Sequence, residues 1–245
     1  MSTGTATLLE RTHEGTDHGA WLRYLADRAA VELADAPAAE IVRWASAAFG
    51  DRLAVTASMA DSLVIDLASR VAPGVDVLFL DTGYHFVETI ATRDAVAATY
   101  PVRVRSIEPE QTVAEQDEAY GRDLFARDPD RCCALRKVAP LDRALEGYTA
   151  WLTGLRRDDS PARADTPVVA YDEARGKVKV NPIAAWTDEQ VAAYIETHSV
   201  LVNPLLSDGY GSVGCAPCTR RLRPGEDARA GRWAGLAKSE CGIHR

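Results

Sequence analysis

Short apolar segments alternate with longer helical segments between residues 53 and 153. Residues 53–56, 75–80 and 149–153 are apolar runs of strand length, and residues 102–105 alternate in polarity as an edge strand does. Helical patterns lie at about 61–69, 86–99 and 134–145. Strands and helices that alternate in this way form βαβ units around a mostly parallel sheet. We therefore expect an α/β fold, and 245 residues are enough to bury a sizeable core.

The segments on either side of this pattern differ from it. Residues 21–48 predict two amphipathic helices broken near Pro37. Thr187 and Gln190 have the spacing of a capping box, which predicts a helix to about His198. The last forty residues are rich in Gly, Pro, Arg and Cys and show little periodicity, which is typical of a site-forming or mobile segment.

Composition excludes several classes of protein. No apolar run approaches the roughly 18 residues of a membrane span, so we expect no membrane partner. A net charge of −8 argues against non-specific nucleic-acid binding. Residues 1–20 lack the basic and apolar regions of an export signal, so we expect a cytoplasmic protein. In that reducing compartment, the five cysteines are expected to bind metal or do chemistry rather than form structural disulfides.

Polar and small residues follow two of the predicted strands. Ligands of α/β sheets bind beyond the carboxyl ends of the strands, where hydroxyls and backbone N–H groups can hold a phosphate. The alternative is that Asp61 and Ser62 only cap their helix. No Walker lysine motif is present, so this is not a standard P-loop. The candidate ligand-binding residues at these strand ends are Thr56, Ser58, Asp61, Ser62, Asp81, Thr82 and Gly83.

Four of the five cysteines form two close pairs, Cys132-Cys133 and Cys215-Ala216-Pro217-Cys218. Four thiolates suit an iron–sulfur cluster or a structural zinc. Adjacent cysteines favour the larger cluster, because neighbouring side chains diverge. The alternative is a redox C-x-x-C with two incidental core cysteines.

The fifth cysteine, Cys241, lies near the end of the chain and has His244 close by in sequence. A nucleophilic thiol must be exposed and able to reach its substrate, and a mobile tail meets the second condition. An inert surface cysteine is the alternative. Basic residues gather near these motifs, and arginine forks suit phosphate and sulfate, although a solvated face is the simpler reading. The basic groups are Arg136-Lys137, then Arg156, Arg157 and Arg163, and then Arg220, Arg221, Arg223, Arg229 and Arg232.

Five motifs in combination are highly specific. They are Cys132-Cys133-x-x-Arg136-Lys137-x-x-Pro140-Leu141, Trp151-x-Thr153-Gly154-x-Arg156-Arg157-x-x-Ser160-Pro161, Gly214-Cys215-x-Pro217-Cys218-Thr219, Arg229-x-Gly231-Arg232-Trp233 and Glu240-Cys241-Gly242-x-His244. Over about residues 50–245 the chain resembles the assimilatory adenylyl-sulfate (APS) reductases of the phosphoadenylyl-sulfate reductase family. The resemblance implies an adenine nucleotide α-hydrolase-like fold, a [4Fe-4S] cluster, and thioredoxin or glutaredoxin as electron donor. It is compatible with a homo-oligomer.

The resemblance also implies roles for single residues. Cys132, Cys133, Cys215 and Cys218 would ligate the cluster, Cys241 would be the nucleophile, and Lys137 would lie between cluster and substrate. Arg229, Arg232 and His244 would contact the phosphosulfate. Thr56 to Ser62, Asp81 to Gly83, and Arg156 with Arg157 would hold the nucleotide. The chain then divides into a disordered tail at 1–18, a nucleotide-binding domain carrying the cluster at 19–225, and a catalytic tail at 226–245.

The implied reaction is reduction of APS to sulfite and AMP through an S-sulfocysteine intermediate. Reduction of 3′-phosphoadenylyl sulfate (PAPS), alone or with APS, is the nearest alternative, but PAPS-specific relatives typically lack the two cysteine pairs. An adenylyltransferase or pyrophosphatase of the same fold would carry a glycine-rich loop, whereas residues 58–62 contain no glycine. A metal-binding regulator would explain the cysteine pairs but not the arginine groups.

Overall fold

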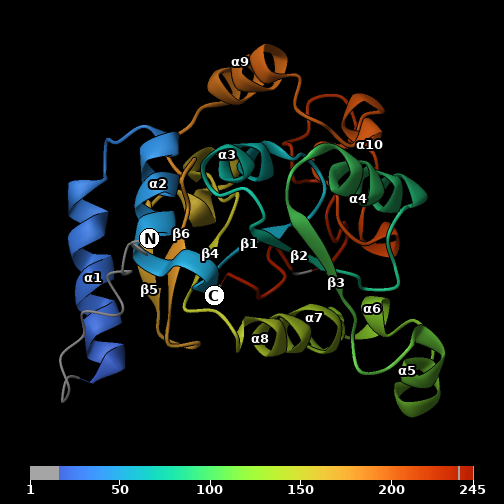
Figure 1. The fold of residues 1–245 in the computed structure, drawn as a ribbon. Helices are drawn as coiled ribbons and strands as arrows, with labels where there is room; N and C mark the ends of the chain where they lie inside the picture. Colours follow the sequence, from blue (N-terminus) through green and yellow to red (C-terminus); the bar gives the residue numbers. More distant parts are fainter. Residues whose placement is uncertain (1–16, 237, 245) are drawn as a thin grey trace.

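Within residues 17–236 and 238–244, which the computed structural model describes, six strands form one sheet in the order β3-β2-β1-β4-β6-β5 (Figure 1). The strands are β1 (Leu53–Ala57), β2 (Asp76–Leu80), β3 (Arg103–Ile107), β4 (Ala150–Leu152), β5 (Val169–Asp172) and β6 (Lys177–Val180). Neighbouring strands are parallel except β5 and β6, which pair antiparallel. The predicted mostly parallel sheet is confirmed, and β5 and β6 are additions that the apolar pattern did not predict.

The burial of each strand follows its place in the sheet. All three residues of β4, at the centre, are fully buried, as are Ala54 and Val55 of β1. β3 lies at an edge, and its Arg103, Arg105 and Ser106 side chains are exposed, as an edge position predicted. Continuous apolar runs therefore mark the strands that are covered on both faces.

Helices cover both faces of the sheet (Figure 1). On one face, α2, α3 and α4 pack against β1 and β3, and together with α1 and α9 they bury the larger apolar core. On the other face, α8 packs against β2 and β3 over a smaller cluster that includes Trp151 and Leu141. The α-helices are α1 (His18–Glu32), α2 (Ala38–Phe49), α3 (Leu63–Val71), α4 (Val87–Thr99), α5 (Val113–Tyr120), α6 (Leu124–Arg127), α7 (Pro129–Cys133), α8 (Ala139–Leu145), α9 (Asp188–His198) and α10 (Pro204–Ser207).

The predicted helices are present with shifted ends. The break near Pro37 separates α1 from α2, and α9 begins with the predicted capping box of Thr187 and Gln190. Residues 1–16 of the predicted N-terminal tail lie outside the described residues. Asp17 caps α1 by accepting the Gly19 amide at 3.0 Å, and His18 is already helical, so the tail prediction is wrong at its last two residues.

The helix predicted over 134–145 starts earlier than expected. α7 begins at Pro129, where the Asp128 side chain accepts the Arg131 amide at 3.0 Å, and it ends at the cysteine pair. A π-helical turn at Ala134–Val138 then joins it to α8. Such turns are rare and are often found at functional sites. Short 3₁₀ turns lie at Gly50–Arg52, Arg157–Asp159, Pro161–Arg163 and Ala216–Cys218.

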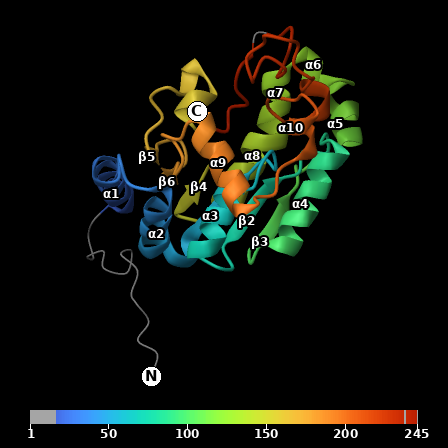
Figure 2. The same ribbon diagram turned by 90° about the horizontal axis from the view of Figure 1, so that it is seen from above.

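The strand order changes direction between β1 and β4. From β1 the chain moves outward to β2 and β3, and it then returns to β4 on the other side of β1. The crevice beyond the carboxyl ends of such strands is where doubly wound folds bind ligands. The C-terminal segment (red in Figure 2) lies beside α7 and α10. No helix in the described part of the chain is long and apolar enough to cross a membrane.

Candidate functional site

A cleft with an open volume of about 420 Å³ lies at the carboxyl ends of β1, β2 and β4. Its size is within the range of small-molecule sites. Its walls come from the strand ends, from the turn after α7, and from the C-terminal segment. The structure thus brings together nine of the residues that sequence predicted for the site, namely Thr56, Ser58, Asp61, Lys137, Arg156, Arg229, Arg232, Cys241 and His244.

The glycine-free loop after β1 keeps a tight turn without glycine. Met59 has a φ of 59°, in the left-handed region that glycine usually occupies. Its side chain is fully buried, and its carbonyl accepts the Asn203 side-chain amide at 3.0 Å. The Asp61 carboxylate accepts the Leu63 amide at 3.0 Å, and its burial raises the pKa of Asp61. Contacts with the loop before α10 therefore keep Met59 in a backbone conformation that usually requires glycine.

Five other predicted substrate residues do not line this cleft. Ser62 is completely buried. The Asp81 carboxylate accepts the Gly83 amide at 3.1 Å, while the Thr82 hydroxyl lies 3.3 Å from the Cys215 sulfur. Arg157 donates to the Thr166 carbonyl at 2.9 Å. The turn after β2 thus serves the cysteine region, and Arg157 secures the loop after β4.

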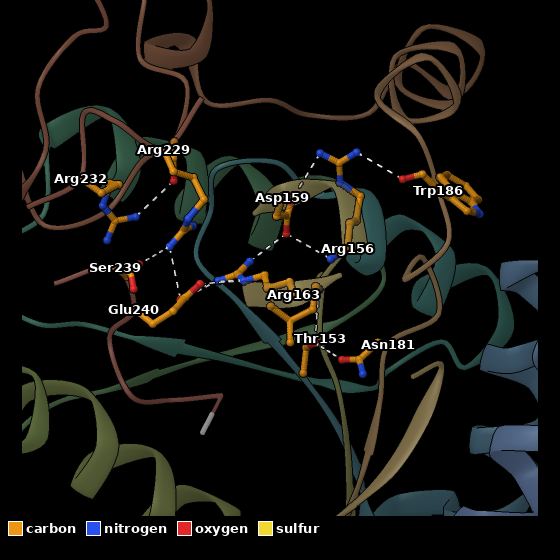
Figure 3. A network of polar contacts seen from close by, with 12 residues as sticks. Thr153, Arg156, Asp159, Arg163, Asn181, Trp186, Arg229, Arg232, Ser239 and Glu240 are labelled. Atoms are coloured by element: carbon orange, nitrogen blue, oxygen red, sulfur yellow. Dashed lines mark hydrogen bonds and ion pairs between the residues drawn. The ribbon is translucent and has the colours of Figure 1, made fainter. Parts of the chain in front are cut away.

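A chain of alternating charges crosses the cleft (Figure 3). Arg156 contacts Asp159 at 3.1 Å, and Asp159 accepts from Arg163 at 2.8 Å. Arg163 then donates two bonds of 2.8 Å to Glu240, which also lies 3.3 Å from Arg229. These charged contacts link the loop after β4 to Glu240, the residue directly before Cys241.

Arg232 keeps an unused donor at the cleft. Its Nη1 group lies 3.3 Å from both the Ser212 hydroxyl and the Val213 carbonyl. Its Nε atom is buried and has no hydrogen-bond partner. An unpaired buried donor costs free energy, which a bound anion would recover. A β-carbon at Gly214 would lie 2.2 Å from this guanidinium, so only glycine leaves room for it.

Four sulfurs line a second, mainly apolar cavity: those of Cys132, Cys133, Cys215 and Cys218. Burial and the three neighbouring thiols raise the pKa of Cys132 to about 12. Burial and Cys215 raise the pKa of Cys218 to about 11. Burial alone would also raise the pKa of Cys215, but Lys137 and the Thr82 hydroxyl outweigh it and the net shift is downward.

The donor set of this cavity fits a sulfur-ligated metal group. Thiolates are the ligands that iron–sulfur clusters and zinc prefer, and their mutual repulsion is relieved when metal binds. Cys215 comes from a loop whose next residue, Ala216, donates its amide to the Tyr84 carbonyl at 2.7 Å. Among the described residues, no three His, Cys, Asp or Glu side chains are grouped as ligands of a single ion.

Lys137 lines both the cleft and the cysteine cavity. Burial by itself lowers the pKa of Lys137, but Cys215 and Cys241 outweigh it and the net shift is upward. The ammonium group is therefore charged between the cysteine cavity and Cys241. The resemblance implies a place between cluster and substrate for Lys137, which stays a prediction.

His244 also lines the cleft, as a neutral imidazole. Its ring stacks on Trp151 with centroids 5.8 Å apart and planes 7° apart. Burial, with added repulsion from Lys179 and Arg163, holds the pKa of His244 well below its ordinary value. His244 can therefore offer a hydrogen bond to a ligand but not a positive charge, and the charge comes from Lys137 and the arginines.

Two further cleft residues were not among the predicted site residues. His85 directs Nε2 at the Leu80 carbonyl at 2.9 Å, and its buried Nδ1 atom has no partner. Burial lowers the pKa of His85, which leaves Nδ1 as a hydrogen-bond acceptor. Glu240 appeared only as part of the terminal motif. The sequence signal for His85 was its place just after β2, and Glu240 carried no signal because its partner Arg163 is distant in sequence.

A profile described as the phosphoadenosine phosphosulfate reductase domain matches residues 52–221. The chain belongs to the phosphoadenosine phosphosulfate reductase family. The family match spans the sheet and both cysteine pairs, and it confirms the resemblance inferred from the motifs.

Relatives in this family are similar over nearly the whole chain. The adenosine 5′-phosphosulfate reductase of Streptomyces coelicolor is 63% identical over 240 residues, which cover 98% of this chain and 99% of that protein. The adenosine 5′-phosphosulfate reductase of Mycolicibacterium smegmatis is 59% identical over 223 residues, 91% of this chain and 94% of that protein.

Solved structures confirm the fold. Phosphoadenylyl-sulfate reductase from Candida auris, crystallised with phosphate, has a TM-score of 0.68 and 31% identity over 80% of this chain and 96% of its own. FMN adenylyltransferase from Candida glabrata has a TM-score of 0.52 at 13% identity, over 89% of this chain and 71% of its own. The second likeness shows the fold alone, so the predicted adenine nucleotide α-hydrolase-like architecture is confirmed.

Proposed function

We propose that this chain reduces adenosine 5′-phosphosulfate to sulfite and AMP, with Cys241 as the nucleophile. The observation that carries the proposal is that Cys241, near the end of the chain, lines one cleft with Lys137 and Arg232 at the carboxyl ends of the strands. Relatives at 55–63% identity that are named adenosine 5′-phosphosulfate reductases support the same substrate.

The reaction needs two thiol steps. The Cys241 thiolate attacks the sulfate sulfur, an S–S bond forms, and the bond to the phosphate oxygen breaks so that AMP leaves with the electron pair. A thiolate of an external dithiol, of the thioredoxin or glutaredoxin class, then attacks the Cys241 sulfur and sulfite leaves with its electron pair. The second thiol of the donor resolves the mixed disulfide. The sulfur is reduced by two electrons, and the donor dithiol is oxidised to a disulfide.

Charge is the main obstacle to the first step, because an anionic thiolate approaches an anionic phosphosulfate. Lys137, Arg229 and Arg232 line the cleft around Cys241 and offset that repulsion. Fixed cations at the point where charge develops stabilise the transition state. The AMP leaving group is a weak base, so the step needs little acid catalysis, which agrees with a neutral His244.

The nucleotide is proposed to bind at the strand ends. Thr56, Ser58 and Asp61 line the cleft there, together with Arg156. Asp159 at 3.1 Å and Asp188 at 2.7 Å hold the Arg156 guanidinium in place. Arg156 is therefore oriented before any ligand enters.

The four cavity cysteines are proposed to hold a [4Fe-4S] cluster. When bound, the cluster would supply a fixed charged group beside Lys137, whereas the thiols supply the electrons. Iron and sulfide analysis of protein purified without oxygen, with a visible spectrum, tests this part. Close to four irons per chain supports it, and zinc in their place contradicts it.

The test of function is the intact mass of the protein after anaerobic incubation with APS and no reductant. A gain of one sulfonate, absent from Cys241→Ser, is expected. Incubation with PAPS in parallel tests the second candidate, which the Candida auris likeness favours. Faster labelling by PAPS would move the substrate assignment to PAPS. No labelling by either substrate, on protein with its metal intact, would overturn the covalent mechanism.

A further inference from the structure

Glu240, the residue directly before Cys241, is bound more tightly than its place near the chain end would suggest. Arg163 donates from Nε to one carboxylate oxygen and from Nη2 to the other, each at 2.8 Å. Arg229 lies 3.3 Å from the same carboxylate and donates to the Ser239 carbonyl at 3.0 Å. We call these contacts of Arg163 and Arg229 with Glu240 the tail clasp (Figure 3).

The two arginines of the tail clasp are not equivalent. Arg163 lies on the 3₁₀ turn after β4, its side chain is only 14% exposed, and Asp159 holds its remaining Nη1 group at 2.8 Å. Arg229 makes one longer contact to Glu240 and lies in the segment from which Arg232 also comes. Arg163 is thus a fixed anchor in the folded domain, whereas Arg229 has donors left for a ligand.

The bidentate geometry fixes direction as well as distance. Two parallel N–H···O bonds between a guanidinium and a carboxylate restrict both groups to one plane. Because Glu240 and Cys241 are neighbours in the chain, fixing the carboxylate also limits where the thiol can lie. Arg163 neutralises the charge of the Glu240 carboxylate, so this carboxylate does not repel an anionic ligand that binds in the cleft.

We propose that Glu240 is a positioning residue that seats Cys241 in the cleft through the tail clasp. The inference rests on the proposed role of Cys241 as nucleophile and adds the device that brings the thiol to the substrate. In this arrangement the substrate takes donors from Arg229 and Arg232, and Arg163 stays with Glu240.

The test measures how fast iodoacetamide alkylates Cys241 in the full-length, metal-loaded protein without substrate, read on the C-terminal peptide by mass spectrometry. Glu240→Gln and Arg163→Gln each break the clasp, and we expect each to raise the rate about tenfold, as expected for loss of one strong charge-assisted bond. The double variant is expected to match the single ones, because both remove the same interaction. Asp159 keeps Arg156 as a partner in every variant.

Glu173→Gln is the matched control. Glu173 also accepts an arginine bond, from Arg23 at 2.6 Å, but it lies outside the cleft on the turn between β5 and β6. In Glu173→Gln, the rate of Cys241 alkylation is expected to equal that of the wild type.

Sulfonation by APS gives the second readout. At saturating APS, Glu240→Gln is expected to lower the single-turnover rate about tenfold with little change in the half-saturating concentration. Alkylation of Glu240→Gln within twofold of the wild type, or additive effects of the two single variants, would overturn the clasp. If the alkylation rates of the wild type and the variants differ as expected but APS never sulfonates the wild type, the proposed function is overturned and the clasp stands.

Discussion

The cysteine cavity and the cleft lie side by side, yet their polar groups are satisfied in different ways. In the wall of the cysteine cavity, Arg136 is almost fully buried, and its donors meet the Thr82 carbonyl at 2.5 Å and the Gln116 side chain at 3.1 Å. In the cleft, Arg232 Nε and His85 Nδ1 are buried without partners. Trp233 lines both regions and its Nε1 atom is buried without a partner. A buried cation that is paired within the protein, as Arg136 is, suits the wall of a resident group, whereas unused donors and acceptors suit a ligand that comes and goes. Lys137 borders both.

The largest expected effect tests the first half of this comparison. Cys215→Ala removes the sulfur that lies nearest to the Thr82 hydroxyl and leaves three thiols around the cavity. We expect complete loss of bound iron, measured by iron analysis and by the visible spectrum after anaerobic purification. Cys241→Ser is the control and should keep its iron. Retention of iron by Cys215→Ala would show that the cavity does not hold the cluster.

The next effect tests Lys137, which joins the two regions. Lys137→Met keeps the length of the side chain but removes its charge, so the thiolate and the phosphosulfate would meet without this cation. We expect the single-turnover rate of Cys241 sulfonation to fall roughly 10²–10³-fold, the usual loss for one such donor. The iron content should be unchanged. A rate within threefold of the wild type, measured by quenched-flow mass analysis, would mean that the arginines alone supply the charge.

A smaller effect sharpens the role of the unused donor in the cleft. Gly214→Ala places a methyl group 2.2 Å from the Arg232 guanidinium, which must then move away. We expect APS to bind about tenfold more weakly, measured as the concentration for half-maximal sulfonation, because one charge-assisted contact is lost. Gly147→Ala is the control, since its β-carbon would meet nothing within 4 Å. Equal half-maximal concentrations in both variants would exclude Arg232 from the substrate site.

The same contrast explains what the sequence could predict. β1, β2 and β4 are buried on both faces, so their apolar runs mark them, and their order along the chain places their polar ends in one cleft. The short β5 and β6 lack such an apolar run, and β6 alternates Lys177 and Lys179 with valines, which is the same pattern that predicted the strand at residues 102–105. The capping box of Thr112 and Glu115 is a sequence signal for the start of α5.

Contacts between distant parts of the chain could not be predicted. Glu240 and Arg163 are 77 residues apart, and no local propensity links them. Met59 in a left-handed conformation is also invisible in sequence, because the Asn203 amide that holds its carbonyl comes from the far end of the domain. Residue types therefore identified the chemistry of the site, and tertiary packing determined which of those residues share a cleft.

The smallest expected effect concerns stability behind the cleft. Burial lowers the pKa of Lys179 to about 8, with Arg175 and Arg163 adding repulsion and Asp172 opposing it. Its ammonium group lies 5.3 Å from the centre of the Trp151 ring, on which His244 also stacks. Below pH 8 the folded and unfolded lysines are both charged, and the folded state carries the cost of burying that charge.

As the pH rises from 8 to about 10.5, the folded lysine loses its proton first, so the unfolded state binds more protons and the folded state gains stability. Lys179→Met has no such gain. We therefore expect the free energy of unfolding of the variant, minus that of the wild type, to be largest below pH 8 and to fall by roughly 1–3 kcal/mol by pH 10.5. Urea unfolding at several pH values measures this difference, and the subtraction cancels the titration of cysteines and tyrosines that both proteins share. A difference that stays constant with pH would mean that the Lys179 ammonium is solvated and its pKa is not lowered. Lys179 would then contribute less to the lowered pKa of His244.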